Sequence, residues 1–505
     1  MAPNNARKVQ PRLQAGALCE DAASPLLAPA DETSHLLDPT SNRVPSSDDG
    51  SLWYEFALLC QYSIPSIATY LLQYSFTIIT TVVAGHLGPR ELGAASVGLS
   101  TLAIVGMAFL EGMATALDTL CAQAYGAGHL TSVGLHVQRM TLFMSALLVP
   151  IGAFCLCSPR ILPLILQDRE LAVEAGRFLQ ISLIGLPGYA YFEAGKRFLQ
   201  AQGDFKAGMV VLIICTPLNA LLSWFFAFRL DMGLDGAALG QAIANNLRPV
   251  LLLIHTTLFS KWSLECWTPW SFRTLHGWGP MVRLSIASSA VNLGEWIAFE
   301  ALAISTSYID TEHLAAQAVL STLCITLWHI PFSISIAVST RIGHLIGSGL
   351  PSVARRAAGF YGIIFTGVGV LDAAVLFIFR HQLSAIFSED STVQAIAEDA
   401  MLILAVFQII DAVNSGLNGI LRGLGLQSVA AWIVLVVNYI AALPLSVWLE
   451  LGSPAMKLKG LWAGMGCGMV LIAIIEAFYM WYINWDDCCQ AEEDREREAE
   501  HIEEV

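Results

Sequence analysis

The chain has 505 residues, of which 55% are hydrophobic and only 13% are charged. Soluble globular proteins carry about 25% charged residues, so the composition excludes a soluble enzyme, a disordered protein and a disulfide-rich scaffold. Most of the net charge of −15 lies in the two ends, because residues 1–52 hold seven acids and four bases, and residues 486–505 hold ten acids and two bases. We therefore expect a polytopic membrane protein with acidic tails, and no basic patch that would bind nucleic acid.

Twelve apolar stretches of roughly twenty residues are long enough to cross a bilayer as helices. The stretches cover residues 54–82, 93–117, 134–157, 175–200, 207–228, 237–259, 280–306, 314–339, 357–379, 400–420, 428–449 and 460–485. They predict an all-α fold with twelve transmembrane helices. An even number of crossings places both tails on one side of the membrane, and the distribution of Lys and Arg favours the cytosolic side.

An internal repeat divides the chain into two halves. Three motifs recur in the same order at offsets of 221 to 224 residues. The pairs are Ala116–Thr119 with Ala337–Thr340, Phe198–Gly203 with Ile420–Gly425, and Leu234–Gly240 with Leu458–Gly464. Six helices in each half predict two lobes in the same orientation, related by pseudo-two-fold symmetry, with substrate bound between them.

The repeat and the apolar stretches together predict five segments. We expect a cytosolic tail over residues 1–52, an N-terminal lobe over 53–260, a cytosolic linker over 261–279, a C-terminal lobe over 280–485 and an acidic cytosolic tail over 486–505.

The chain offers no pattern typical of a metal or cofactor site. Its eleven cysteines are scattered, and those inside apolar stretches are typical of small buried side chains. No Cys/His spacing indicates zinc, and no Walker motif indicates nucleotide binding. We therefore expect no metal and no cofactor, and any transport is expected to draw on an ion gradient.

Carboxylates inside the apolar stretches are the candidate functional residues, because a charge in the bilayer is energetically costly. They are Glu111, Glu193, Glu295, Glu300, Asp372, Asp411 and Glu476. Glu295 and Glu300 share one predicted helix about 140° apart, so both can border a wide cavity. Local pairing with Lys196 and Arg197 explains Glu193, and a structural role is the favoured alternative for Asp372 and Glu476.

The seventh stretch indicates a site for an organic cation. Asn292, Glu295 and Phe299 share one helical face, and a carboxylate flanked by Trp296 and Phe299 can bind a cation through ion pairing and stacking. Asp411 belongs to the same lobe and is expected to face Glu295. Burial and a second nearby carboxylate both disfavour ionisation, so such a pair can hold a proton near neutral pH. The predicted cavity also includes Gln73, Glu111, Glu300 and Asn438.

Several short motifs occur along the chain in a fixed order: Ala84–Gly88, Gly112–Gly128, Phe198–Gly203, Val338–Arg341 and Leu421–Gly425. In this order they resemble the motifs of the multidrug and toxic compound extrusion (MATE) transporters, over residues 53–485. The resemblance implies that Asp118, Gln123, Arg341 and Arg422 are motif residues with structural roles.

The same resemblance implies roles for the acidic residues. Glu295, Trp296 and Glu300 match the seventh helix of eukaryotic members, and Asp411 with Arg422 matches the tenth. Two positions depart from the pattern: Leu320–Leu323 lacks the Glu of animal members, and Gln73 stands in the region where prokaryotic members carry an Asp. The chain is thus nearer to the plant and fungal branch, and Glu295 and Asp411 are implied as the proton-coupling residues.

The predicted function is secondary active export of organic cations, drugs or metabolites in exchange for protons, by alternating access of the two lobes. One alternative is a flippase for lipid-linked sugars, which needs a basic cavity for phosphate groups. Another is a membrane-embedded acyltransferase, for which His329 beside Pro331 is the one mid-helix candidate. We expect a monomer in the bilayer that binds protons and small organic substrates and no nucleic acid.

The two tails carry possible sorting and acylation patterns. Glu32, Leu36 and Leu37 fit the acidic dileucine pattern Glu-x-x-x-Leu-Leu, which predicts delivery to the vacuolar membrane, with the plasma membrane as the alternative. Cys488 and Cys489 follow the last apolar stretch and are candidates for palmitoylation.

Overall fold

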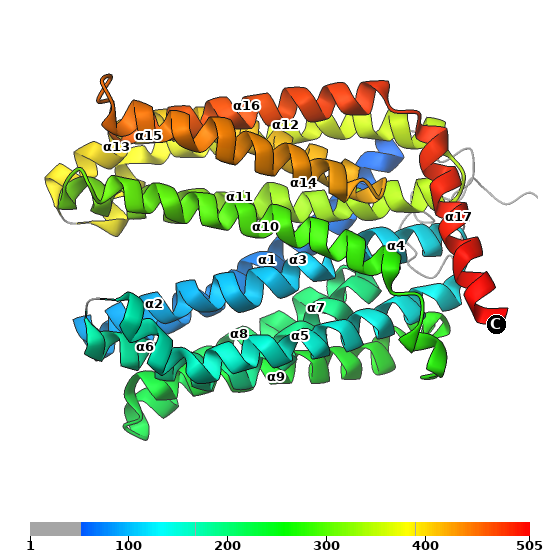
Figure 1. The fold of residues 1–505 in the computed structure, drawn as a ribbon, viewed down its shortest axis with the longest axis horizontal. Coiled ribbons are helices and arrows are strands. Elements are labelled where there is room, and N and C mark those ends of the chain that lie inside the picture. Colours follow the sequence, from blue (N-terminus) through cyan, green and yellow to red (C-terminus); the bar gives the residue numbers. More distant parts are fainter. Residues whose placement is uncertain (1–51, 167, 389, 505) are drawn as a thin grey trace, which may run out of the picture. The chain divides into compact units, whose positions relative to one another are not determined.

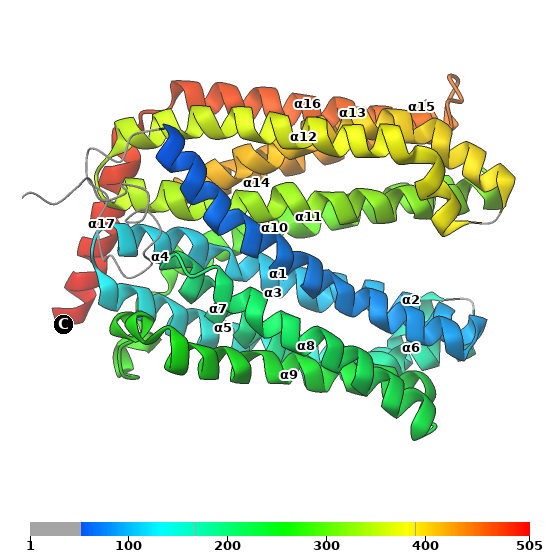
Figure 2. The same ribbon diagram turned by 180° about the vertical axis from the view of Figure 1, so that it is seen from behind.

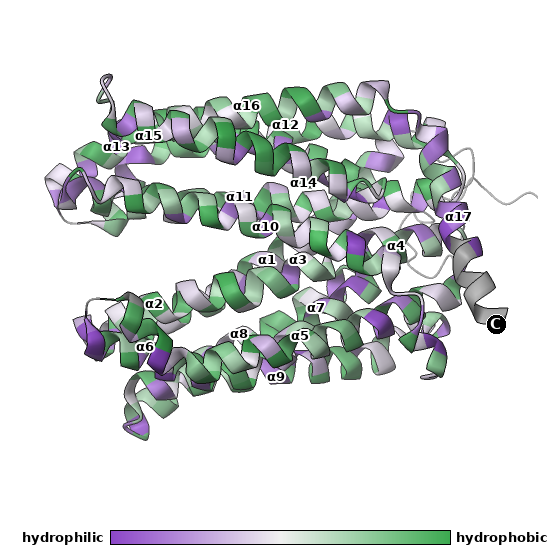
Figure 3. Ribbon diagram, viewed as in Figure 1, coloured by the Kyte–Doolittle hydropathy of each residue, from purple (hydrophilic) through white to green (hydrophobic). Residues whose placement is uncertain are grey.

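A computed structural model describes residues 52–166, 168–388 and 390–504, and these residues are almost entirely helical (Figure 1). The dileucine residues Glu32, Leu36 and Leu37 lie outside the described residues. Figure 3 shows that hydrophobic residues dominate the middle of the helices, whereas hydrophilic residues concentrate towards their ends. Large apolar side chains such as Val149, Phe377 and Phe478 are exposed, as expected for surfaces that face lipid.

Residues 52–259, which we call the N lobe, form the first six of the predicted spans. These are α1 (Leu52–Leu87); α2 (Pro89–Leu102), η2 (Ala103–Met107), α3 (Ala108–Ala114) and α4 (Ala116–Gly126) in one line; α5 (Leu130–Ile165); α6 (Arg169–Ser182), η3 (Leu183–Gly185) and α7 (Leu186–Ala201) in one line; α8 (Lys206–Trp224) with η4 (Phe225–Arg229); and α9 (Gly233–Phe259).

Residues 279–482, which we call the C lobe, form the other six. These are α10 (Gly279–Thr306), α11 (Thr311–Gly347), α12 (Pro351–Phe387), α13 (Ser391–Gly423), α14 (Gln427–Val436) with η7 (Val437–Ala442) and α15 (Leu443–Leu451), and α16 (Leu458–Tyr482). The short helices η5 (Lys261–Cys266) and η6 (Phe272–Leu275) connect the lobes, and α17 (Trp485–Glu504) follows the C lobe.

The predicted all-α architecture of twelve spans in two lobes is confirmed. Among the described residues, ten of the spans are long and apolar enough to cross a membrane by composition alone. The other two are the α6–α7 segment and α10. The first of these carries Glu193, Lys196 and Arg197, whose charges lower its hydropathy. These less apolar spans lie against the interior of the bundle, where polar residues can find partners.

The internal repeat is visible in the way equivalent helices end. Gly128 after α4 and Gly349 after α11 both have positive φ, at 83° and 68°. Gly203 after α7 and Gly425 after α13 likewise have φ of 87° and 79°. A residue with a Cβ is strained in this left-handed conformation, which explains glycine at these four helix ends.

The two lobes converge at the end where α17 lies, which we call the tail end, and diverge towards the opposite end, the loop end (Figure 1). Figure 2 shows α1 running diagonally from the C lobe at the tail end into the N lobe at the loop end. In the other direction, α10 leans on the N lobe, where Asn292 Nδ2 donates to the Ala108 carbonyl at 2.8 Å. The first helix of each lobe therefore packs partly against the other lobe.

The first turn of α1 is fixed to the C lobe by a buried ion pair. Arg341 of α11 donates through Nε to both carboxylate oxygens of Glu55, at 3.1 and 3.0 Å, and through Nη2 at 2.5 Å. Tyr361 of α12 donates its hydroxyl to the same carboxylate at 2.6 Å. All three side chains are buried, so each charged group here depends on the others for its hydrogen bonds.

Helix α17 crosses the tail end of both lobes. Trp485 and Cys488 are buried in an apolar cluster with residues of α11 and α12, and Arg495 Nη2 donates to Gln123 Oε1 of α4 at 3.0 Å. Burial raises the pKa of the Cys488 and Cys489 thiols to about 11. Cys488 is only 5% exposed, so Cys489 is the better placed of the two for acylation, which stays a prediction.

Replacement of Glu55 should destabilise the protein strongly. In Glu55→Ala the Arg341 guanidinium stays buried without its counter-charge, and removal of one partner from a buried pair costs about 3–5 kcal/mol of unfolding free energy. Thermal unfolding in detergent, followed by tryptophan fluorescence, should show a clearly lower midpoint. Glu170→Ala breaks the exposed Arg90–Glu170 pair and should leave the midpoint nearly unchanged. Equal midpoints for the two variants would contradict the importance of the Glu55–Arg341 pair.

Candidate functional site

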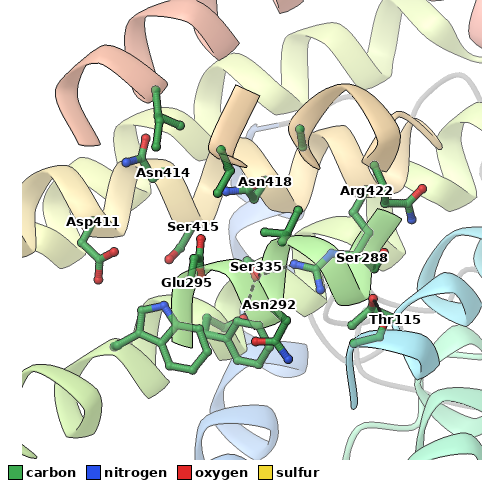
Figure 4. A pocket seen from close by; sticks show the side chains of 18 of the residues that line it. Thr115, Ser288, Asn292, Glu295, Ser335, Asp411, Asn414, Ser415, Asn418 and Arg422 are labelled. Atoms are coloured by element: carbon green, nitrogen blue, oxygen red, sulfur yellow. Dashed lines mark hydrogen bonds between the residues drawn. The ribbon is translucent and has the colours of Figure 1, made fainter. Parts of the chain in front are cut away.

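A cavity lies between the lobes, and side chains from both of them line it (Figure 4). The N lobe contributes the α3 end, and the C lobe contributes α10, α11, α13, α14 and α16. The polar lining residues are Glu111, Thr115, Ser288, Asn292, Glu295, Ser335, Asp411, Asn414, Ser415, Asn418, Arg422 and Gln427. Apolar side chains, among them Trp328, Phe332 and Met469, complete the walls.

Two of the lining carboxylates come from different helices of the C lobe. Glu295 lies on α10 and is half-buried, whereas Asp411 lies on α13 and is only 6% exposed. Figure 4 shows both side chains at the same end of the cavity. The structure thus brings Glu295 and Asp411 to one site, together with the predicted Asn292, Glu111 and Arg422.

The aromatic surface of the cavity comes from α11. Trp328 and Phe332 are stacked, with ring centroids 4.4 Å apart and an interplanar angle of 21°. Together with Ser335 they follow one helical face at i, i+4 and i+7, and none of the three is among the predicted site residues. Asn414, Ser415 and Asn418 of α13 were missed as well, although they follow Asp411 at helical spacing.

Arg422 connects the cavity to the tail end of the lobe interface. Its Nη1 lies 3.4 Å from Asp118 Oδ2 of α4, and its Nη2 donates to Ser335 Oγ at 3.1 Å. Asp118 also accepts two hydrogen bonds from Arg197 Nη1 of its own lobe, at 2.7 and 2.6 Å. One carboxylate is therefore shared between two arginines from different lobes.

Further hydrogen bonds join the two lobes on the tail-end side of this ion cluster. Gln123 Nε2 donates to the Gly423 carbonyl at 2.9 Å, and Thr119 Oγ1 donates to the Arg422 carbonyl at 2.6 Å. At Gly126 and Gly347, a Cβ would overlap the backbone of the opposite lobe. Glycine at these two positions lets the helices of the two lobes approach closely, which closes the cavity towards the tail end.

A second polar cluster fills the interior of the N lobe. Lys196 Nζ donates to Glu193 Oε1 at 2.9 Å and to Gln73 Oε1 at 3.2 Å, and Gln73 Nε2 donates to Glu193 at 3.0 Å. The local pairing of Glu193 therefore agrees with its sequence interpretation. Gln73, which the sequence predicts in the cavity, lies in this cluster and is not among the residues that line the cavity.

Four other predicted cavity residues also lie elsewhere: Trp296, Phe299, Glu300 and Asn438. Phe299 shares the face of Glu295, but one turn farther along α10 it packs against Trp462, with ring centroids 6.3 Å apart. Glu300 is exposed on the opposite side of α10, as its angular distance from Glu295 requires. Trp296 lies beside that face and is half-buried.

Asn438 is buried in the π-helical segment η7, and neither atom of its amide has a hydrogen-bond partner among the described residues. Glu476 of α16 is likewise buried, with both carboxylate oxygens unpartnered within the described part of the chain. No cluster of three His, Cys, Asp or Glu side chains that could hold a metal ion occurs in residues 52–166, 168–388 and 390–504.

Comparison with known proteins gives a consistent result. The MatE family model matches residues 65–225 and 287–448, one match in each lobe. An uncharacterized transporter of Saccharomyces cerevisiae is 35% identical over 435 residues, which are 86% of this chain and 62% of the yeast protein. Protein DETOXIFICATION 16 of Arabidopsis thaliana is 30% identical over 427 residues, which are 84% of this chain and 87% of that protein.

Among solved structures, the eukaryotic MATE transporter AtDTX14 superposes with a TM-score of 0.82 at 27% identity. The alignment covers 88% of this chain and 99% of AtDTX14. The similarity therefore extends over both lobes and the cavity between them.

Neutralising Asp118 should loosen the tail end of the lobe interface. Asp118→Asn removes the charge shared by Arg197 and Arg422, and loss of one member of a buried ion cluster costs about 3–5 kcal/mol. We expect conformations that are open at the tail end to become more populated. Spin labels on Lys206→Cys and Arg356→Cys, in a background without native cysteines, should report a longer distance component by electron–electron double resonance. Glu170→Gln, remote from the interface, should not change the distances, and an unchanged distribution in Asp118→Asn would refute the role of the cluster.

Proposed function

Since the chain belongs to the MatE family of membrane transporters, we propose that it is a secondary active antiporter, which exports organic cations in exchange for protons. The observation that carries this proposal is the presence of Glu295 and Asp411, together with a stacked aromatic pair, in one cavity between the lobes. We also propose that the protein works as a monomer, because the cavity lies between the two lobes of a single chain.

The chemistry of the cavity favours a cationic substrate. Glu295, which is half-buried, and Asp411, which is buried, offer negative charge in a site where ion pairing is stronger than in bulk water. Trp328 and Phe332 offer aromatic faces, which attract cations and stack on planar groups. Among the residues that the structure describes, Arg422 is the one basic side chain in the lining, and it already contacts Asp118.

The same carboxylates can hold protons. A carboxylate in a poorly solvated site must be neutralised by a proton or by a bound cation, and both cannot occupy it fully at once. Binding of protons therefore weakens binding of the substrate, and the reverse holds equally by linkage. Couplings of about 1–3 kcal/mol between two ligands are typical, which corresponds to a 5- to 150-fold change in affinity.

Exchange then follows from alternating access. With both tails in the cytosol, as we propose, the lobes are closed on the cytosolic side and diverge on the other side. Protons from the acidic side neutralise Glu295 and Asp411, and the substrate leaves. Opening of the tail end separates Arg422 from Asp118, the protons leave to the cytosol, and the recharged cavity binds the next cation.

The alternative functions fit the cavity less well. A flippase for lipid-linked sugars must bind phosphate groups, whereas three of the four ionisable side chains in the lining are acidic. The acyltransferase alternative rested on His329, whose Nδ1 lies 2.6 Å from the Ile325 carbonyl and whose ring packs on Tyr74. Because the MatE family is a transporter family, the enzyme alternative does not hold.

Neutral variants of the two carboxylates test the mechanism. Glu295→Gln mimics the protonated state, so we expect weak cation binding and loss of proton-driven exchange. Asp411→Asn should behave in the same way or transport without dependence on pH. The assay uses purified protein in proteoliposomes with an imposed pH gradient and labelled N-methyl-4-phenylpyridinium. Glu300→Gln on the same helix as Glu295 is the matched control and should exchange at the parental rate.

If Glu295→Gln and Asp411→Asn both retained full proton-driven exchange, the coupling site would lie elsewhere. Wild-type exchange that follows a sodium gradient and ignores the pH gradient would replace the proton with sodium as the coupling ion.

We further propose that the vacuolar membrane is the site of action, because Glu32, Leu36 and Leu37 fit an adaptor-recognised sorting pattern. Leu36→Ala with Leu37→Ala should move a fluorescent fusion from the vacuolar membrane to the plasma membrane. Leu26→Ala with Leu27→Ala changes another Leu-Leu pair of the same tail and serves as the control. A double Leu36, Leu37 variant with unchanged location would remove the proposal.

A further inference from the structure

A third carboxylate reaches the cavity from the opposite lobe. Glu111 lies on α3 of the N lobe, is half-buried and lines the cavity together with Glu295 and Asp411 of the C lobe. The proton-exchange mechanism proposed above uses only the two residues of the C lobe. Glu111 therefore adds negative charge to the cavity for which that mechanism gives no reason.

Two buried basic residues of the N lobe are already bound to other acids, and a third, Arg248, packs on the rings of Phe76 and Phe192. Lys196 is hydrogen-bonded to Glu193 and Gln73, and Arg197 is bound to Asp118. Within the described residues, the donor that contacts the Glu111 carboxylate is the Tyr189 hydroxyl, at 3.5 Å, the outer limit of a hydrogen bond. The Glu111 carboxylate is consequently left to interact with what occupies the cavity.

The charges of the lining residues do not balance. Four ionisable side chains line the cavity: Glu111, Glu295, Asp411 and Arg422. With all four ionised, the lining lacks two positive charges. Asp118, which Arg422 also contacts, is paired with Arg197 and leaves this balance unchanged. Two protons fill this deficit, and so does one ligand that carries two positive charges.

The spacing of the carboxylates suits a ligand with separated charges. Helices α3 and α10 cross in opposite directions, with Met113 near Ser285 and Ala108 near Asn292, so Glu111 is level with about residue 288 of α10. Glu295 is then some seven residues nearer the loop end, which is about 10 Å along the axis. Asp411 also lies towards the loop end. Arg422 of the same helix is level with Asp118 of α4, and Asp411 precedes Arg422 by about three turns in the direction of the loop end.

We propose that Glu111 is a second anionic pole of the cavity and that the preferred substrates are rigid aromatic dications. One positive centre of the ligand lies at Glu111 of the N lobe, the other lies at Glu295 and Asp411 of the C lobe, and the aromatic body packs on Trp328 and Phe332. The inference rests on the proposed function and specifies its substrate class. A dication held in this way contacts both lobes, whereas a monocation needs only the C lobe.

A matched pair of probes tests the proposal. Methyl viologen and N-methyl-4-phenylpyridinium share a biaryl body and differ in the second quaternary nitrogen. Calorimetric titration of the purified full-length protein gives the Kd of each probe and their ratio, which is the preference for the dication. We expect wild-type protein to prefer methyl viologen, and Glu111→Gln to reduce the preference about tenfold. Glu111→Asp keeps the charge and should retain most of the preference, while Glu300→Gln should leave the ratio unchanged.

The outcomes separate this inference from the proposed function. An equal preference in wild type and Glu111→Gln, with binding of both probes intact, overturns the inference and leaves proton–cation exchange standing. The same holds if Glu111→Asp loses as much preference as Glu111→Gln, because the effect then does not depend on the charge. Failure of the wild-type protein to bind either probe contradicts both proposals.

Discussion

Asp118 is shared by two arginines, Arg197 from its own lobe and Arg422 from the other, and this shared charge organises the interior of the protein. In a span with no water to solvate it, each buried charge needs a partner, because an unpaired one costs several kcal/mol. The shared carboxylate joins the lobes at the tail end and places Arg422 at the edge of the cavity. The acidic residues of the cavity lie on the loop-end side of this ion cluster. The basic side chains that line the cavity there are too few to balance their charge.

The packing of α1 on the C lobe and of α10 on the N lobe explains how the lobe interface can be stable and still allow the lobes to move. Helix α1 is fixed to the C lobe by Glu55, and α10 is fixed to the N lobe through Ser289 and Asn292. These contacts lie towards the tail end and the middle of the interface, while the lobes diverge at the loop end (Figures 1 and 2). Movement that opens the tail end must therefore act on the Asp118 cluster and on the small-residue contacts at Gly126 and Gly347.

Much of the architecture could be predicted from the sequence, because span length, the repeat and the cost of buried carboxylates are local or compositional properties. Glu295 and Asp411 were singled out in this way, and both line the cavity. Helical periodicity predicts that Phe299 shares a face of α10 with Glu295. It cannot predict that Trp462 of α16 packs on Phe299, one turn beyond the cavity. Gln73 was misplaced because the cluster that holds it is built from residues more than a hundred positions away. The Glu55–Arg341 pair has no sequence pattern at all.

The distance of 286 residues between Glu55 and Arg341 has a consequence for biogenesis. Glu55 is synthesised near the start of the chain, whereas its counter-ion leaves the ribosome only after the whole N lobe and two more spans have been made. At a translation rate of about 5–20 residues per second, α1 waits roughly 15 to 60 s before its carboxylate can be paired. During that time the Glu55 carboxylate lacks the guanidinium that pairs with it in the folded protein. The first turn of α1 therefore reaches its final packing only after the helices of the C lobe that hold Arg341 and Tyr361 have been made.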